Sequence, residues 1–189
     1  MRFRDRGLVR TADGSYDFNA DVDRLHEFGG KLIHHLHRQR LEAVAPNGTI
    51  LWEDYDEFLA QAETGIDAEG FHETGLVRFV AFDMQFLLTS HRYYIYAEKP
   101  DAVSPAELCC HMLLIDDGSR PRSYCLLLLG HVDVEEADLR AQAATYGVED
   151  EIDALFRYLK THGEVDDDRL PEYEEFQELA ADYELPLPQ

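Results

Sequence analysis

The chain has 189 residues, of which 39 are acidic and 17 are basic, so its formal net charge is -22. This charge argues against direct nucleic-acid binding, which needs a basic surface, and against attraction to an anionic membrane. Hydrophobic residues make up 45% of the chain, which is enough apolar material for a globular core. The longest aliphatic run, Leu126 to Leu129, is far too short to span a bilayer.

The N-terminus and the cysteines both predict a cytoplasmic protein. The first six residues include three arginines, and no apolar stretch typical of a signal peptide follows them. Cys109 and Cys110 are adjacent, and Cys125 is the third cysteine of the chain. An odd number of cysteines without regular spacing is not a disulfide framework, so we expect reduced thiols.

The acidic charge is concentrated toward the C-terminus. Residues 1–52 hold eight basic and seven acidic side chains, whereas residues 133–189 hold eighteen acidic and four basic ones. Three interpretations stay open: adaptation to high salt, a surface for a basic partner or a mimic of nucleic-acid charge, and an ordinary acidic protein. The small number of lysines, three of 17 basic residues, fits salt adaptation. The uneven distribution favours a partner.

The first third of the chain predicts a small hairpin followed by two helices. Residues 2–10 alternate in polarity, and a turn at 12–15 leads into a short return strand at 16–18. Residues 21–44 predict a helix, because their apolar side chains recur every three or four positions. The spacing of apolar residues predicts a second, shorter helix over 53–63.

The middle of the chain predicts an antiparallel sheet. Residues 76–88 alternate with period two and contain aromatic and β-branched side chains, and 93–97 predict the returning strand. The segment 107–116 is ambiguous, because the residues from Ser104 to Glu107 have the form of a helix capping box. The strand-like sequence of 124–134 nevertheless favours a β-hairpin made of these two segments.

The acidic C-terminal part predicts three helices, at 135–146, 149–161 and 171–184. The expected fold class is therefore α+β: two N-terminal helices, an antiparallel sheet of four or more strands, and acidic C-terminal helices. We expect a single domain over residues 1–189, with an acidic helical subregion at 135–189.

A candidate ligand or metal site depends on that predicted hairpin. With a turn near Ser119, one face of the hairpin consists of apolar core residues, and Glu107 lies opposite His131 on the other face. This second face also carries Cys125, and its candidate ligand or metal residues are Glu107, Cys109, His111, His131 and Asp133. A group of cysteine, histidine and carboxylate side chains suits metal ligation or thiol–imidazole chemistry, although buried cysteines are also common in cores. No particular metal or cofactor follows from the sequence.

Two further groups of residues have structural interpretations. His34, His35 and His37 are spread around the predicted helix, so we expect solvated histidines rather than a metal site. The arginines near the N-terminus, Arg2, Arg4 and Arg6, are expected to protect a sheet edge or to pair with acidic helices. Recognition of phosphate or carboxylate is the alternative for these arginines.

Known catalytic and nucleotide-binding motifs are missing from the sequence: GxGxxG, GxxxxGK[ST], GxSxG, CxxC and HExxH. The favoured function is that of a non-enzymatic binding or regulatory protein, whose acidic C-terminal helices face a basic protein partner or solvent. The alternative is a small enzyme or ligand-binding domain that uses the Cys/His/carboxylate face. The sequence specifies neither a substrate nor an oligomeric state.

Overall fold

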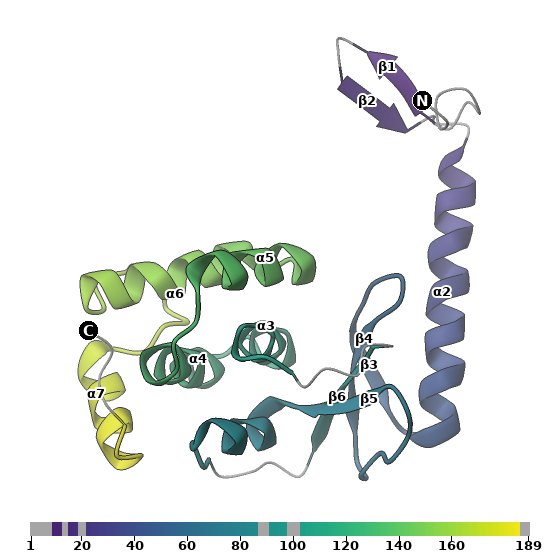
Figure 1. Cartoon of the computed structure of the whole chain (residues 1–189). Coiled ribbons are helices and arrows are strands. Elements are labelled where there is room, and N and C mark those ends of the chain that lie inside the picture. The colour runs from purple at the N-terminus through teal and green to yellow at the C-terminus, as the bar shows by residue number, and fades with distance from the viewer. Residues whose placement is uncertain (1–8, 13–14, 19–21, 87–90, 98–102, 186–189) are drawn as a thin grey trace. The chain divides into compact units, whose positions relative to one another are not determined.

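The computed structural model describes residues 9–12, 15–18, 22–86, 91–97 and 103–185 (Figure 1). The chain divides into two compact units, residues 1–46 and 47–189. The expectation of a single domain over 1–189 stays a prediction.

The N-terminal unit contains a hairpin close to the predicted one and the first predicted helix, whereas residues 2–8 of the predicted first strand lie outside the described residues. Strands β1 (Val9–Ala12) and β2 (Ser15–Phe18) pair antiparallel, and α2 (Asp23–Val44) follows. Ion pairs at helical spacing join Lys31 to Glu27 and Arg38 to Glu42. Arg2, Arg4 and Arg6 lie outside the described residues, so both interpretations of these arginines stay predictions.

The C-terminal unit contains a four-stranded antiparallel sheet, which confirms the α+β class. Its strands are β3 (Thr49–Glu53), β4 (Phe58–Ala62), β5 (Phe71–Thr74) and β6 (Arg92–Tyr96). They pair in the order β3-β4-β6-β5, so β5 is an edge strand with β6 as its neighbour.

Two predicted elements of this region are wrong. The predicted helix at 53–63 is the end of β3, a turn and β4, an interior strand in which four of five residues are buried. A strand buried this evenly shows no alternation, so its apolar spacing also fits a helix. The predicted strand at 76–88 contains instead a 3₁₀-helix, η2 (Gly75–Phe82), in which Leu76, Phe79 and Phe82 recur every three residues.

The predicted hairpin of 107–116 and 124–134 is also wrong. Two helices, α3 (Pro105–Ile115) and α4 (Ser119–His131), occupy these segments. The capping box is present: the Ser104 hydroxyl accepts from the Glu107 backbone N–H at 3.2 Å, and the Glu107 carboxylate accepts from the Ser104 N–H at 2.9 Å. Both helices are buried on nearly all sides, so their sequences contain no polar face that would reveal a helical period.

The three acidic helices are confirmed as α5 (Glu136–Tyr146), α6 (Glu149–Thr161) and α7 (Tyr173–Asp182). Helix α3 lies at the centre of this unit, in contact with α4, α5, η2 and β3 (Figure 1). Within the described ranges, no helix has both the length and the apolar character needed to cross a membrane.

Candidate functional site

The five residues predicted to share a sheet face are divided between two helices and a loop. Glu107, Cys109 and His111 lie on α3, His131 is the last residue of α4, and Asp133 follows that helix. His131 and Asp133 are exposed, whereas Cys109 and His111 are buried. Because the hairpin does not exist, its register cannot place Glu107 beside His131.

Metal ligation has no geometric support in the part of the chain that the structure describes. No group of three or more histidine, cysteine, aspartate or glutamate side chains there is arranged to hold an ion. In the histidine cluster of α2, His34 and His35 are exposed as predicted, but the prediction of a solvated side chain is wrong for His37, which is buried.

His111 belongs to a buried chain of hydrogen bonds. Its Nδ1 lies 2.9 Å from the Thr74 hydroxyl and its Nε2 lies 3.0 Å from the Tyr146 hydroxyl, so it links β5, α3 and α5. Burial lowers the pKa of His111 to about 3, which keeps the imidazole neutral. A neutral ring with one donating and one accepting nitrogen matches two hydroxyl partners, so His111 joins these three elements in the core.

The thiols are packed inside the same core. Cys109, Cys110 and Cys125 are all fully buried and free of disulfides. A side-chain hydrogen bond between the neutral Cys109 thiol and Cys125, followed by burial, raises the pKa of Cys109 well above its ordinary value. The three side chains therefore pack as small apolar groups of the core.

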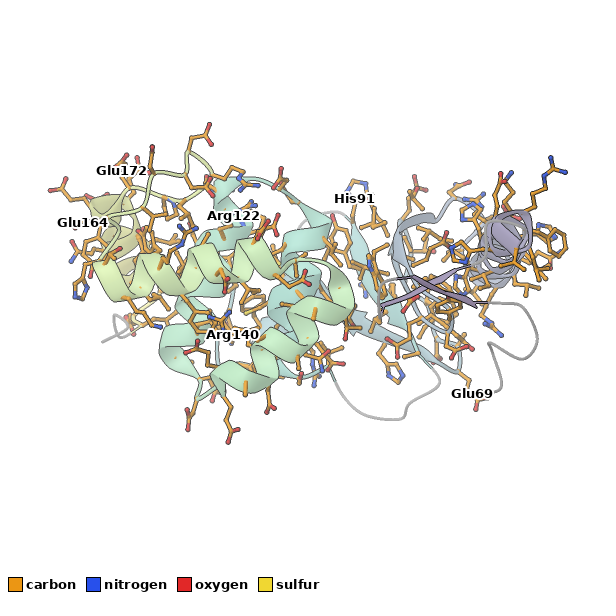
Figure 2. All side chains as sticks on the ribbon, turned by 90° about the horizontal axis from the view of Figure 1, so that it is seen from above. Glu69, His91, Arg122, Arg140, Glu164 and Glu172 are labelled. Carbon is orange, nitrogen blue, oxygen red and sulfur yellow. The ribbon has the colours of Figure 1, made fainter. Side chains whose placement is uncertain are left out.

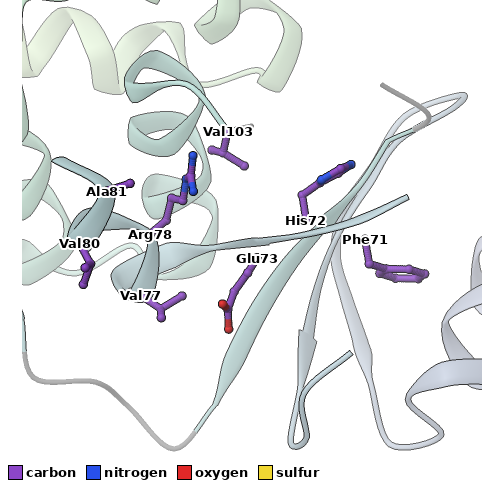
Figure 3. A pocket seen from close by; sticks show the side chains of 8 residues that line it. All are labelled: Phe71, His72, Glu73, Val77, Arg78, Val80, Ala81 and Val103. Atoms are coloured by element: carbon purple, nitrogen blue, oxygen red, sulfur yellow. The ribbon is translucent and has the colours of Figure 1, made fainter. Parts of the chain in front are cut away.

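A pocket of about 590 Å³ lies where β5 ends and η2 begins, and it contains none of the predicted site residues (Figure 3). The turn into η2 depends on Gly75, whose φ is +73°, and a Cβ there would meet the Tyr93 ring at 3.1 Å. The residues that line the pocket are Phe71, His72, Glu73, Val77, Arg78, Val80, Ala81 and Val103.

Arg78 and His72 line this pocket on the same side of β5 (Figure 3). The Nε atom of Arg78 and the Nε2 atom of His72 are buried and have no hydrogen-bond partner among the described residues. Arg38, Arg122 and Arg169, the other described arginines that are buried or half-buried, each pair with a carboxylate. Leaving such groups unpartnered costs about 1–3 kcal/mol each, so the pocket favours a partner that accepts hydrogen bonds.

The carboxylate in the pocket does not pair with Arg78. Glu73 is bound to Arg92, with 3.1 Å between Oε1 and Nη1, and its side chain points to the opposite side of β5 from His72 (Figure 3). Arg92 therefore compensates the charge of Glu73, and the guanidinium of Arg78 keeps its positive charge for another group. In the sequence, the signal for this site was Arg78 itself, a charged residue inside the apolar run from Leu76 to Phe82.

The second notable surface is the acidic one, formed by α5, α6, α7 and the segments beside them. Arg140 bridges Glu136 and Asp153, and Arg169 pairs with Asp167. Many other carboxylates project outward, as Glu164 and Glu172 do in Figure 2. The exposed carboxylates without an ion-pair partner among the described residues are Asp133, Glu135, Asp138, Glu149, Asp150, Glu164, Asp166, Asp168, Glu172, Glu174, Glu175, Glu178, Asp182 and Glu184.

Comparison with known proteins gives one match. A family model described as HVO_2833_C, C-terminal, matches residues 68–185, a range that contains η2, α3 to α7 and all eight residues of the pocket. Comparisons with curated proteins and with solved structures found no match.

Proposed function

The chain belongs to the HVO_2833_C family, and we propose that it is a non-enzymatic binding protein that takes a small anionic group in the pocket beside β5. The observation that supports this most directly is the buried Nε atom of Arg78, which has no hydrogen-bond partner among the described residues and lies in a pocket also lined by His72. An anion supplies Arg78 with a hydrogen-bond acceptor and an opposite charge, and it supplies an acceptor for His72 in the tautomer that carries the proton on Nε2. No cysteine is among the described residues that line the pocket, and no set of metal ligands occurs among the described residues.

The preference of the pocket for an anion comes from the charge of Arg78 and not from the net charge of the protein. A chain with a net charge of -22 repels anions at long range, but this repulsion is largely screened beyond about 8 Å at physiological salt. Recognition therefore depends on short-range contacts with Arg78 and His72. A planar guanidinium binds carboxylate or phosphate through paired hydrogen bonds, which a lysine in its place does not reproduce.

The test is calorimetric titration of the full chain with acetate and with inorganic phosphate. We expect Arg78→Gln to weaken binding about 10- to 100-fold, because a hydrogen bond to a charged group contributes about 1.5–3 kcal/mol and 1.4 kcal/mol corresponds to a factor of ten. Arg157→Gln is the matched control, because Arg157 is exposed on α6 and does not line the pocket. Equal binding by both variants, or no binding by the unmodified chain, would refute the proposal.

A second function is favoured by the unpaired carboxylates of α5 to α7: a surface for a basic protein partner, with adaptation to high salt as the competing explanation. Repulsion among these carboxylates destabilises the fold in both cases, so we expect the melting temperature to rise between low and molar salt. The melting temperature of the triple variant Glu174→Gln, Glu175→Gln and Glu178→Gln should respond less to salt.

Polylysine binding distinguishes the two explanations. Saturable binding to the unmodified chain, together with weaker binding to the triple variant, supports a partner surface. A salt response without such binding supports adaptation. A melting temperature independent of salt would remove the repulsion argument.

A further inference from the structure

Strand β5 has an open edge. It pairs with β6 on one side, and the described part of the chain contains no strand on its other side. The Ala97 N–H donates to the Gly70 carbonyl at 2.9 Å, so this opposed pair is hydrogen-bonded. Because hydrogen-bonded and non-bonded pairs alternate in an antiparallel ladder, the backbone of His72 faces β6 and that of Glu73 faces away.

The free backbone groups of this edge border the pocket. The Phe71 N–H donates to the Ala68 carbonyl at 3.2 Å. The Phe71 carbonyl and both backbone groups of Glu73 remain directed to the open edge. Phe71, His72 and Glu73 all line the pocket, although successive side chains of a strand point to opposite faces. One cavity that touches all three therefore runs along the edge of the strand (Figure 3).

We propose that the ligand is the C-terminal end of an extended peptide, which adds to the edge of β5 as a further strand and places its terminal carboxylate at Arg78. This inference rests on the proposed binding of an anion in the same pocket. Peptide backbone supplies donors for the Phe71 and Glu73 carbonyls and an acceptor for the Glu73 N–H. The terminal carboxylate supplies the opposite charge for the guanidinium of Arg78, which has no ion-pair partner in the described ranges.

The size and walls of the pocket fit a peptide end better than a single small ion. A cavity of about 590 Å³ is in the range that holds ligands much larger than acetate or phosphate. Phe71, Val77 and Val103 offer apolar surface on its walls for the side chains of an added strand. β-branched residues suit such a strand, so a peptide that ends in two valines is the appropriate probe.

The probe is the acetylated tetrapeptide Lys-Thr-Val-Val with a free carboxylate, titrated into the full chain. We expect C-terminal amidation to weaken binding about tenfold or more, and Arg78→Gln to weaken it equally. Combining amidation with Arg78→Gln should add little further loss, because both changes remove the same contact. Arg157→Gln should bind the peptide like the unmodified chain.

Two further pairs of measurements test strand addition itself. N-methylation of each valine in turn should weaken binding about tenfold at one position and little at the other, because alternate residues of a strand face the neighbouring strand. Glu73→Pro should bind the peptide more weakly than Glu73→Gln, because both variants lose the carboxylate and only Glu73→Pro also loses the N–H at the open edge. The melting temperature of each variant shows whether it is folded.

The outcomes separate the two proposals. If acetate binds through Arg78 as tightly as the peptide does, the anion site stands and the peptide inference is wrong. If the amidated peptide binds as well as the free acid, or if both N-methylated peptides bind normally, the inference is also wrong. If neither acetate nor the peptide binds, both proposals fail together.

Discussion

The buried His111 should make the fold sensitive to acid, and the size of this effect follows from its environment. His111 is 1% exposed, and burial lowers its pKa from 6.5 to about 3. The unfolded chain therefore binds a proton at His111 below pH 6.5, whereas the folded chain binds it only near pH 3. The stability that comes from keeping His111 neutral is complete above pH 6.5 and is lost as the pH falls toward 3.

The loss amounts to about 1.4 kcal/mol for each pH unit below 6.5, or about 3 kcal/mol at pH 4.5. Other groups titrate in the same range, so the measurement is a difference between two proteins. His111→Gln carries no titrating group, and its free energy of unfolding should be lower than that of the unmodified chain at pH 7. This gap should shrink by about 3 kcal/mol between pH 7 and pH 4.5.

Urea denaturation followed by circular dichroism, at constant ionic strength, measures the gap at each pH. Gln39→Ala is the control, because Gln39 is exposed and carries no titrating group. We expect its gap to stay constant. A gap for His111→Gln that also stays constant from pH 7 to pH 4.5 would refute the conclusion that His111 is neutral and buried.

Two other predictions concern the core and a helix end. Cys109, Cys110 and Cys125 should react with an alkylating reagent only after denaturation, because all three side chains are fully buried, and rapid labelling of the native chain would contradict this packing. Ser104→Ala should lower the free energy of unfolding by about 1 kcal/mol because it removes the cap of α3, with Ser119→Ala at the uncapped start of α4 as the control. Equal losses in urea denaturation would mean that the capping box contributes nothing.

Patterns of neighbouring residues predicted the helices and the hairpin that are partly exposed to solvent. Helix α2 and the acidic helices α5 to α7 were placed to within a few residues, because their apolar stripes alternate with polar faces that meet water. The hairpin of β1 and β2 followed from a short turn between two alternating segments. The same kind of signal was absent in α3 and α4, where burial on nearly all sides removes the polar face and leaves the capping box as the only local mark of a helix.

The candidate site could not be predicted in the same way, because it depends on contacts between segments distant in the sequence. The sequence shows that Arg78 is charged. That Arg78 lacks a partner depends on the folded chain, in which the nearby Glu73 pairs with Arg92. The five candidate residues from Glu107 to Asp133 would lie on one face only if their segments formed the predicted hairpin. Because these segments are helices, the five residues are not brought together.

The sequence alone determined the acidity of the protein, the exposure of its C-terminal helices and the capping box that starts α3, since each depends on composition or on residues a few positions apart. Only the tertiary structure decided that β4 is an interior strand, that β5 is an edge strand, and that Phe71, Arg78 and Val103 surround one pocket. These features arise from burial and strand pairing between distant segments. Their free energy is gained only when those segments meet, so no local pattern of residues records them.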